Sequence, residues 1–268
     1  MIMTFSSKTI VSTVIVLVVL AVQFGAAQQA PAPPRGNQPP NATDPRATNG
    51  TVYTNKTELF ATFRPPFIAG QATRIGAHLS KLGERFLPYA DVTVTATLTV
   101  AGVSVKQSVI KPDRPGVFRL DLTPGKAGTG RLVFDIAGPD GTDRLVFDNV
   151  LVYTDRADAL AHQGPNLDAG AIRYSKEQSW DENEYASAPV ESRVLDSNPA
   201  ASRVLAVPRT AVLQIEGAPY VYVQRHPEAF DLKEVKTGKS SGTYVEISSG
   251  LREGERIVIK GADRMPRK

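Results

Sequence analysis

The chain has 268 residues, a formal net charge of +4 and no cysteine. This length allows one large domain or two small ones. Lysine and arginine are spread along the chain without a basic stripe interleaved with aromatic residues, which argues against nucleic-acid binding. Without cysteine, disulfides, thiolate metal sites and a cysteine nucleophile are excluded.

Residues 1–27 have the pattern of a targeting segment. Lys8 gives a short positive region, Ile10–Val22 is apolar, and the small residues Gly25–Ala27 follow. This order predicts a cleaved signal peptide. The alternative is an uncleaved membrane anchor, because residues 10–27 just reach the length that spans a bilayer. In either case we expect an exported protein, and export without cysteine favours a Gram-negative periplasm.

Residues 28–56 follow as a predicted Pro-rich linker. Gln28–Asn49 are rich in Pro, Gln, Asn and Ala and carry no hydrophobic period. Such a composition cannot bury a core, so we expect either an extended linker or a disordered terminus here.

Residues 57–154 are predicted to form an immunoglobulin-like β-sandwich. The clearest strand is Asp91–Val100, in which Val, Ala and Leu alternate strictly with Thr, so that one face is buried and the other is coated with threonine. The other strand candidates are Leu59–Phe63, Thr73–Leu79, Val103–Ile110, Gly116–Leu122, Gly130–Ile136 and Arg144–Tyr153. About seven short strands in this length are typical of such a sandwich. Its predicted core includes Val94, Leu98, Phe118, Leu120, Leu132 and Phe134.

Residues 155–201 are polar and are predicted to be a connector. A short helix is expected near Arg156–His162. The only tryptophan, Trp180, lies in this stretch. The acidic group beside it, which we interpret as solvated, comprises Asp181, Glu182 and Glu184.

Residues 202–262 form a second β-rich block. Short strand patterns alternate here with the turn sequences Glu216–Pro219, Gly238–Gly242 and Arg252–Gly254. They predict a small β-barrel or roll, followed by a basic tail at residues 263–268. The predicted fold class is therefore all-β, with an N-terminal immunoglobulin-like sandwich and a C-terminal small β-barrel or roll.

Part of this second block resembles a known family. The run Val207–Val212, the strand Tyr220–Val223 and the segment Glu253–Glu255 are similar to the membrane-proximal domain of periplasmic adaptor subunits. These adaptors are the membrane fusion proteins of resistance-nodulation-division (RND) efflux pumps, and the similarity is to the heavy-metal type. Members of the family carry a lipoyl-like domain and a long helical hairpin before this block, whereas here only Glu191–Ala206 intervene, without a helical period. The resemblance therefore implies a shortened form that lacks both.

The sequence contains no pattern that indicates catalysis. It has no Gly-x-Ser-x-Gly elbow, no His-Glu-x-x-His and no phosphate-binding glycine loop. The histidines His78, His162 and His226 lie one in each region, with no spacing that suits a shared metal site. After the targeting segment only Met265 remains, so a methionine cluster for a soft cuprous or silver ion is absent from the sequence. We therefore predict a non-enzymatic protein without a cofactor or a metal site.

The resemblance implies a protein partner instead. Adaptors of this family dock on an inner-membrane RND transporter and associate with copies of themselves, so we expect the same here, close to the membrane. Arg209, Arg225 and Lys236 are the predicted partner-binding residues, because long cationic side chains on a β-surface pair with acidic loops and raise the association rate. The alternative hypothesis is an independent periplasmic module that binds or senses a small ligand or a metal.

Overall fold

The computed structural model describes residues 46–83, 86–162, 164, 168–181, 185–195 and 202–267. All of these residues fall within one compact unit. The predicted targeting segment, most of the predicted linker, and Glu182 and Glu184 of the acidic group lie outside the described residues. No helix within the described ranges is long and apolar enough to cross a membrane.

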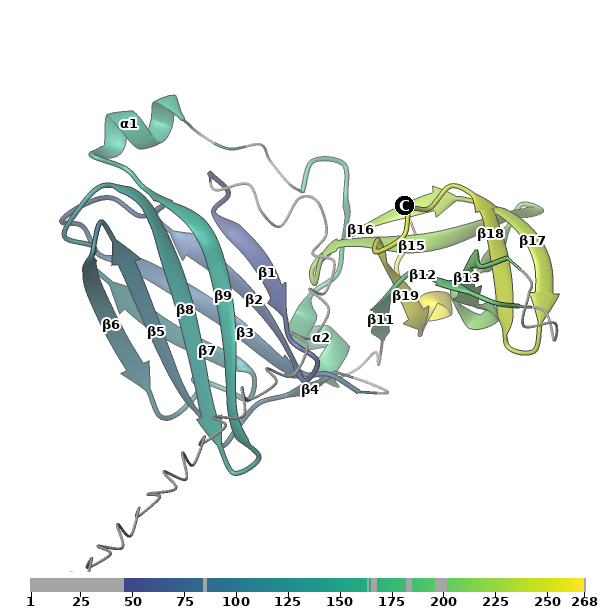
Figure 1. Cartoon of the computed structure of the whole chain (residues 1–268), viewed down its shortest axis with the longest axis horizontal. Coiled ribbons are helices and arrows are strands. Elements are labelled where there is room, and N and C mark those ends of the chain that lie inside the picture. Colours follow the sequence, from purple (N-terminus) through teal and green to yellow (C-terminus); the bar gives the residue numbers. More distant parts are fainter. Residues whose placement is uncertain are drawn as a thin grey trace, which may run out of the picture. The chain divides into compact units, whose positions relative to one another are not determined.

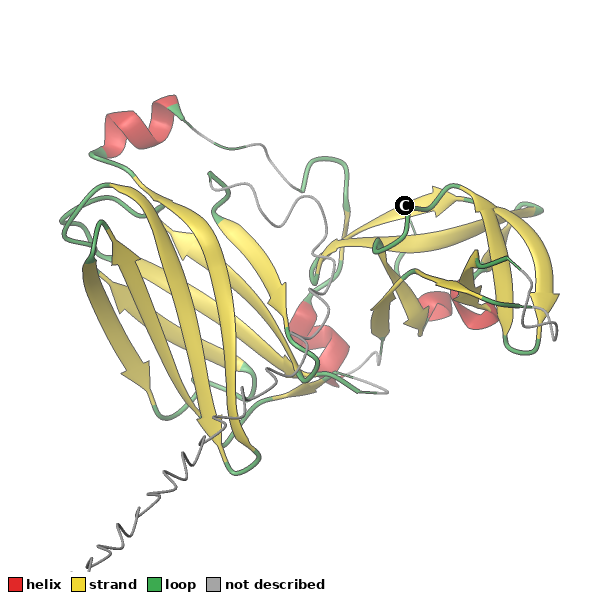
Figure 2. Ribbon diagram, viewed as in Figure 1, coloured by secondary structure: helices red, strands yellow, loops and turns green. Residues whose placement is uncertain are grey.

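Two antiparallel sheets form the N-terminal sandwich (Figure 1, Figure 2). The first sheet comprises β1 (Asn49–Tyr53), β2 (Thr57–Arg64), β3 (Thr73–Lys81) and β4 (Leu87–Pro88) in this order, with β7 (Val117–Leu122) also paired to β3. The second comprises β6 (Val103–Val109), β5 (Thr93–Val100), β8 (Gly128–Gly138) and β9 (Gly141–Val152) in this order. Each strand predicted for the sandwich is present, with its ends shifted by a few residues.

The sandwich core follows from the alternation of its strands. In β5 the Val, Ala and Leu side chains are buried, and the Thr side chains are half-buried on the opposite face. The six residues predicted for the core are all buried, which confirms the assigned register. The Phe147 ring packs edge-on against Phe63 and Phe134, with ring centroids 5.9 Å apart in both pairs. Apolar packing therefore holds the two sheets together in a chain that has no cysteine.

The predicted linker at residues 28–56 ends earlier than its sequence indicates. Asn49–Tyr53 form β1, which pairs antiparallel with β2, with Thr51 opposite Phe60. Thr51 and Val52 are buried, so this segment belongs to the sandwich. A strand of 5 residues is too short to show a period, and it forms because the edge of β2 offers unpaired backbone groups.

Much of the predicted connector, residues 155–201, also has regular structure. The expected short helix is present as α1 (Arg156–Ala161), and the Asp155 side chain caps it by accepting a hydrogen bond from the Asp158 amide. The other elements are β10 (Ile172–Arg173), α2 (Lys176–Asp181), β11 (Ala186–Pro189) and β12 (Glu191–Arg193). These three strands pair with strands of the C-terminal block, so they extend its sheets rather than forming a plain connector.

The C-terminal part consists of two further sheets. Its strands are β13 (Val204–Pro208), β14 (Leu213–Ile215), β15 (Ala218–His226), β16 (Ala229–Glu234), β17 (Lys236–Ser241), β18 (Tyr244–Ser249) and β19 (Arg256–Lys260), with 3₁₀ turns η1 (Arg209–Ala211) and η2 (Ala262–Arg264). One sheet has the order β10-β16-β15-β19-β11 with β14 paired to β15, and the other has the order β12-β13-β18-β17. Val207, Val221, Val245 and Ile257 belong to one buried cluster. The described strands pair into two open sheets and do not close into a barrel.

The first part of the predicted basic tail, residues 263–268, packs onto this fold. Met265 is buried, and the Tyr222 hydroxyl donates a hydrogen bond to the Pro266 carbonyl oxygen at 3.0 Å. Met265 therefore belongs to the C-terminal core, while its neighbours Arg264 and Pro266 are exposed.

The register of β5 predicts different responses to substitutions on its two faces. Leu98 is 1% exposed, so Leu98→Ala should lower the free energy of unfolding by about 2 to 5 kcal/mol. Thr97→Ala, on the opposite face, should cost less than about 1 kcal/mol. Urea unfolding followed by circular dichroism measures both values. Equal costs for the two variants would show that the register is wrong.

Candidate functional site

A buried ion pair fixes α2 against the sandwich. Lys176 Nζ lies 2.5 Å from Glu58 Oε2, and the two side chains are 1% and 0% exposed. Nζ also lies 3.7 Å from the centroid of the Phe86 ring, in cation–π geometry. A buried charge is tolerated only when it is paired, because desolvation costs several kcal/mol per ion. The position of Lys176, at the start of α2, is therefore set by Glu58 on β2.

Residues of the C-terminal sheets complete this buried group. The Arg256 guanidinium of β19 lies 4.1 Å from the centroid of the Tyr53 ring and donates a hydrogen bond to the Ser187 carbonyl oxygen at 2.7 Å. The pKa of Tyr53 is raised well above its ordinary value, first by burial and then by the charge of Glu58. Tyr53 therefore stays neutral. The one negative charge of this buried group is the carboxylate of Glu58, and its two cations are Lys176 and Arg256.

The only tryptophan holds α2 near its other end. The Trp180 indole nitrogen donates a hydrogen bond to Ser80 Oγ on β3 at 3.1 Å. The Trp180 ring lies so close to Gly116 that a Cβ atom there would overlap it, and Gly116 has a φ of +81°. Only glycine accepts both the close approach and this backbone conformation without strain. The helix is thus attached to the sandwich through Lys176 and Trp180.

This attachment brings three potential metal ligands together. They are His78 on β3, Glu177 on α2, and Glu228 in the turn between β15 and β16. His78 Nε2 lies 3.8 Å from Glu177 Oε1, and His78 Nδ1 lies 3.5 Å from Glu228 Oε1. One ligand atom from each residue can be chosen so that all lie within 4.8 Å of one another. We call these three residues the His78 cluster.

Two arginines and a serine surround the carboxylates of the His78 cluster. Arg114 Nη2 lies 2.7 Å from Glu177 Oε1, and Ser175 Oγ donates to Glu177 Oε2 at 2.8 Å. Arg173 Nη2 lies 3.3 Å from Glu228 Oε2. Burial raises the pKa of Glu177, but the hydrogen bond from Ser175 and the charges of His78 and Arg114 outweigh it, so the pKa lies below its ordinary value. The Glu177 side chain is therefore ionised at neutral pH.

The His78 cluster lines a hollow of about 600 Å³ in the protein surface. Phe60 and Gly76 contribute to its wall, and Arg64, Arg74 and Arg119 lie among the other lining residues. Solvent ions can therefore reach the cluster. Asp121 also lines the hollow and pairs with Arg74 at 3.0 Å, and Arg119 pairs with Asp113 at 2.5 Å.

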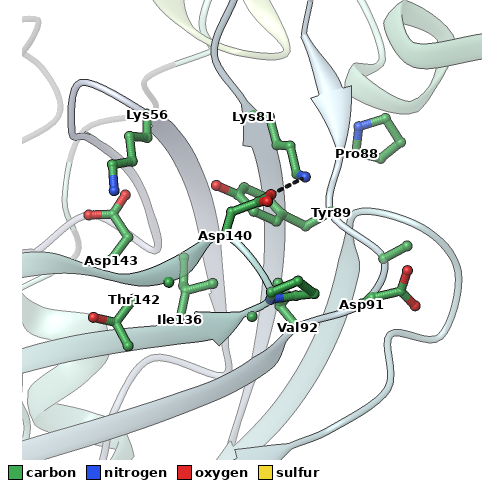
Figure 3. Close-up of a pocket in the computed structure, with 14 residues that line it drawn as sticks. Lys56, Lys81, Pro88, Tyr89, Asp91, Val92, Ile136, Asp140, Thr142 and Asp143 are labelled. Carbon is green, nitrogen blue, oxygen red and sulfur yellow. Dashed lines mark hydrogen bonds and ion pairs between the residues drawn. The ribbon is translucent and has the colours of Figure 1, made fainter.

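A second hollow, of about 320 Å³, lies at one end of the sandwich (Figure 3). Lys81 Nζ pairs with Asp140 Oδ2 at 2.9 Å and lies 5.3 Å from the Tyr89 ring centroid. Asp143 Oδ2 accepts hydrogen bonds from the Thr54 and Thr57 hydroxyls at 2.6 Å each. Lys81, Asp140 and Asp143 in this hollow therefore have partners within the protein.

The other two histidines have partners within the protein. His226 is buried, its Nε2 contacts Asp168 Oδ1, and its ring stacks on Phe60 with centroids 4.9 Å apart. His162, at the end of α1, contacts Asp158 Oδ1 at 2.9 Å. The sequence indicates no metal site when only the spacing of the histidines is considered. The His78 cluster was missed because its other two members are glutamates from distant segments of the chain.

The predicted partner-binding residues differ in their surroundings. Arg209 in η1 and Lys236 at the start of β17 are exposed. Arg225 instead forms a bidentate pair with Asp231, at 2.8 and 2.6 Å, and donates to the Ala169 carbonyl oxygen at 2.8 Å. Arg225 therefore has a structural role in joining β15 to its neighbours, which leaves Arg209 and Lys236 as the freely exposed cations of the three.

Comparison with known proteins supports the resemblance of the C-terminal block to heavy-metal efflux adaptors. Residues 205–262, from β13 to η2, match the family described as the CzcB C-terminal circularly permuted SH3-like domain. No curated protein matches the chain. Among solved structures, the chain is similar to an NMR structure of 180 residues that covers the N-terminal metal-binding site and the membrane proximal domain of SilB from Cupriavidus metallidurans CH34. The identity is 21% over 67% of this chain and 72% of that chain, with a TM-score of 0.27.

The buried pair predicts a pH dependence of stability. Burial is the main cause that lowers the pKa of Lys176 from 10.5 to about 8, against the opposing charge of Glu58. At a pH between these two pKa values, Lys176 is protonated in the unfolded chain and neutral in the folded chain. The free energy of unfolding contributed by this group therefore rises with pH from about 8 to 10.5 and is lowest below pH 8.

Urea unfolding at pH 8.5 and pH 10 tests this, with the Glu58→Gln/Lys176→Met double variant as the control that lacks both charges. The wild type should gain stability relative to the control as the pH rises. An equal or smaller gain in the wild type would contradict the lowered pKa of Lys176.

Proposed function

We propose that this chain is a non-enzymatic, adaptor-like component of an RND-type heavy-metal efflux system in the periplasm, and that it docks on an inner-membrane transporter. The observation that carries the proposal is the match of residues 205–262 to the CzcB C-terminal domain. That match covers the block whose sequence resembles the membrane-proximal domain of adaptors, and no pattern in the sequence indicates catalysis.

The pairing of β12 with β13 supports a shortened form of the adaptor. Glu191 lies opposite Ala206, and Arg193 lies opposite Val204, so the two strands are direct antiparallel neighbours. Only residues 194–203 connect them. A helical hairpin and a lipoyl-like domain cannot be built from this connection, so a chain with this pairing would act on the transporter side of a pump rather than reach an outer-membrane channel.

Exposed cations of the C-terminal block are suited to an acidic transporter surface. Arg209 and Lys236 are exposed, and all residues of the edge strand β17 are exposed as well. Such cations mainly raise the association rate and lose this effect at high salt. The export pattern of residues 1–27 is consistent with this location, whether the segment is cleaved or retained as an anchor.

Capture of an inner-membrane RND transporter of the heavy-metal type tests the proposal. The purified chain should retain the detergent-solubilised transporter at low salt. The Arg209→Ala/Lys236→Ala variant should associate roughly tenfold more slowly, because electrostatic steering is reduced. Adding Arg225→Ala should impair folding rather than recognition, since Arg225 pairs internally with Asp231.

The matched control is the Lys106→Ala/Lys111→Ala variant, which removes the same charge from exposed positions of the sandwich. Its association rate should equal that of the wild type. If the wild type captures no transporter at low salt, the docking proposal is wrong, and an independent periplasmic binding module becomes the better account of the chain.

A further inference from the structure

We propose that His78, Glu177 and Glu228 bind a divalent cation of the zinc type, and that this ion links β3, α2 and the turn between β15 and β16. The proposal goes beyond transporter docking, because binding of a metal by the isolated chain needs no partner. It rests on the ligand set, on one unsatisfied imidazole nitrogen, and on the hollow that exposes the cluster to solvent.

The ligand set fits a borderline divalent cation. One imidazole nitrogen with two carboxylate oxygens is a three-ligand set that Zn²⁺, Co²⁺ and Ni²⁺ accept, with water in the remaining position. Soft monovalent ions such as Cu⁺ and Ag⁺ prefer thiolates and thioethers. No cysteine exists in the chain, and the cluster contains no methionine.

The separation of the ligand atoms is close to what a metal requires. In tetrahedral geometry, ligands about 2.1 Å from the metal lie about 3.4 Å from one another. The cluster atoms lie within 4.8 Å of one another, and His78 Nδ1 lies 3.5 Å from Glu228 Oε1. The 3.8 Å contact of Glu177 is with the other imidazole nitrogen, Nε2, so the Glu177 side chain has to move toward Nδ1 to share the ion. The glutamate side chains are 22% and 18% exposed, so rotation of their outer bonds can close the difference.

His78 supplies an independent indication of a missing ligand. Its Nδ1 atom is buried and has no hydrogen-bond partner among the described residues, although Glu228 Oε1 lies 3.5 Å away. A buried polar atom without a partner is costly, and native structures seldom leave one unsatisfied. A cation placed between His78 and Glu228 would satisfy this nitrogen.

The neighbouring arginines are compatible with metal binding. Arg173 contacts Oε2 of Glu228 and leaves Oε1, the atom that faces His78, available to a metal. Ser175 likewise holds Oε2 of Glu177. Arg114 contacts Oε1 of Glu177, but its side chain is 63% exposed, and an exposed ion pair of this kind costs little to break. The partners on the Oε2 atoms orient the carboxylates, as outer contacts do in known metal sites.

A metal at this position would bind to three elements that are distant in the sequence. Because these elements come together only in the folded chain, the ion binds the folded state and stabilises it by mass action. Zn²⁺ in large excess over its dissociation constant should therefore raise the Tm by about 5 °C or more.

Isothermal titration of the untagged chain with ZnCl₂ tests the proposal, and Co²⁺ provides a second probe through its visible absorption. We expect one Zn²⁺ per chain, and a tetrahedral Co²⁺ spectrum that Zn²⁺ removes. Glu228→Gln preserves the shape of the side chain and should weaken Zn²⁺ binding at least about tenfold. His78→Ala should abolish the Co²⁺ spectrum.

His162→Ala is the matched control, because His162 is an exposed histidine beside a carboxylate and lies outside the cluster. It should bind Zn²⁺ as the wild type does. The proposal is overturned if the wild type binds no Zn²⁺, if Glu228→Gln and His78→Ala bind it unchanged while folded by circular dichroism, or if the affinity falls equally in His162→Ala. Because no transporter is present, failure here leaves the docking proposal intact, and failure of docking leaves this one intact.

Discussion

The buried ion pair between Glu58 and Lys176 determines how the C-terminal sheets connect to the sandwich. A carboxylate on β2 with 0% exposure and an ammonium group with 1% exposure are each costly to bury alone. They are tolerated because folding brings them to 2.5 Å from one another and surrounds the ammonium with the Phe86 and Tyr185 rings. An alternative packing of α2 would leave one buried charge without its partner, so the pair selects a single arrangement.

The His78 cluster follows from that arrangement of α2. Glu177 directly follows Lys176, so fixing Lys176 directs Glu177 toward His78 on β3. The C-terminal turn that carries Glu228 reaches the same place, where Arg173 also contacts it. One buried pair thus accounts for the position of the His78 cluster, whereas the exposed cations of η1 and β17 are positioned by the C-terminal sheets alone. The two proposals of metal binding and transporter docking therefore concern separate surfaces of the chain.

A strand could be predicted from the sequence where it is long enough to show the alternation of apolar and polar residues. The alternation of Asp91–Val100 identified β5, and the buried positions of its neighbours followed from the same rule. By contrast β1, β10, β11 and β12 have 5, 2, 4 and 3 residues, and they exist because a longer strand offers them an edge. The local helix α1 could be predicted because its capping residue, Asp155, lies next to it.

The candidate site was less predictable for a related physical reason. His78, Glu177 and Glu228 share no local spacing, so only tertiary structure brings them together. The pairing of Arg225 with Asp231 across β15 and β16 was equally hidden, and it shows that one of the predicted docking residues also joins two strands. A single sequence signal did exist for the interface: Trp180 is a large side chain in a polar segment, and its partner Gly116 has the backbone freedom that the close contact requires.

A double-mutant cycle on Glu58 and Lys176 tests most directly whether this pair holds the fold together. The free energy of unfolding is measured for the wild type, Glu58→Gln, Lys176→Met and the double variant. Each single change should cost about 3 to 5 kcal/mol because it leaves a buried charge unpaired, and the double variant should be much more stable than the sum of the two costs implies. Costs that add to within about 0.5 kcal/mol would contradict the account, since additivity would mean that the two groups do not depend on each other.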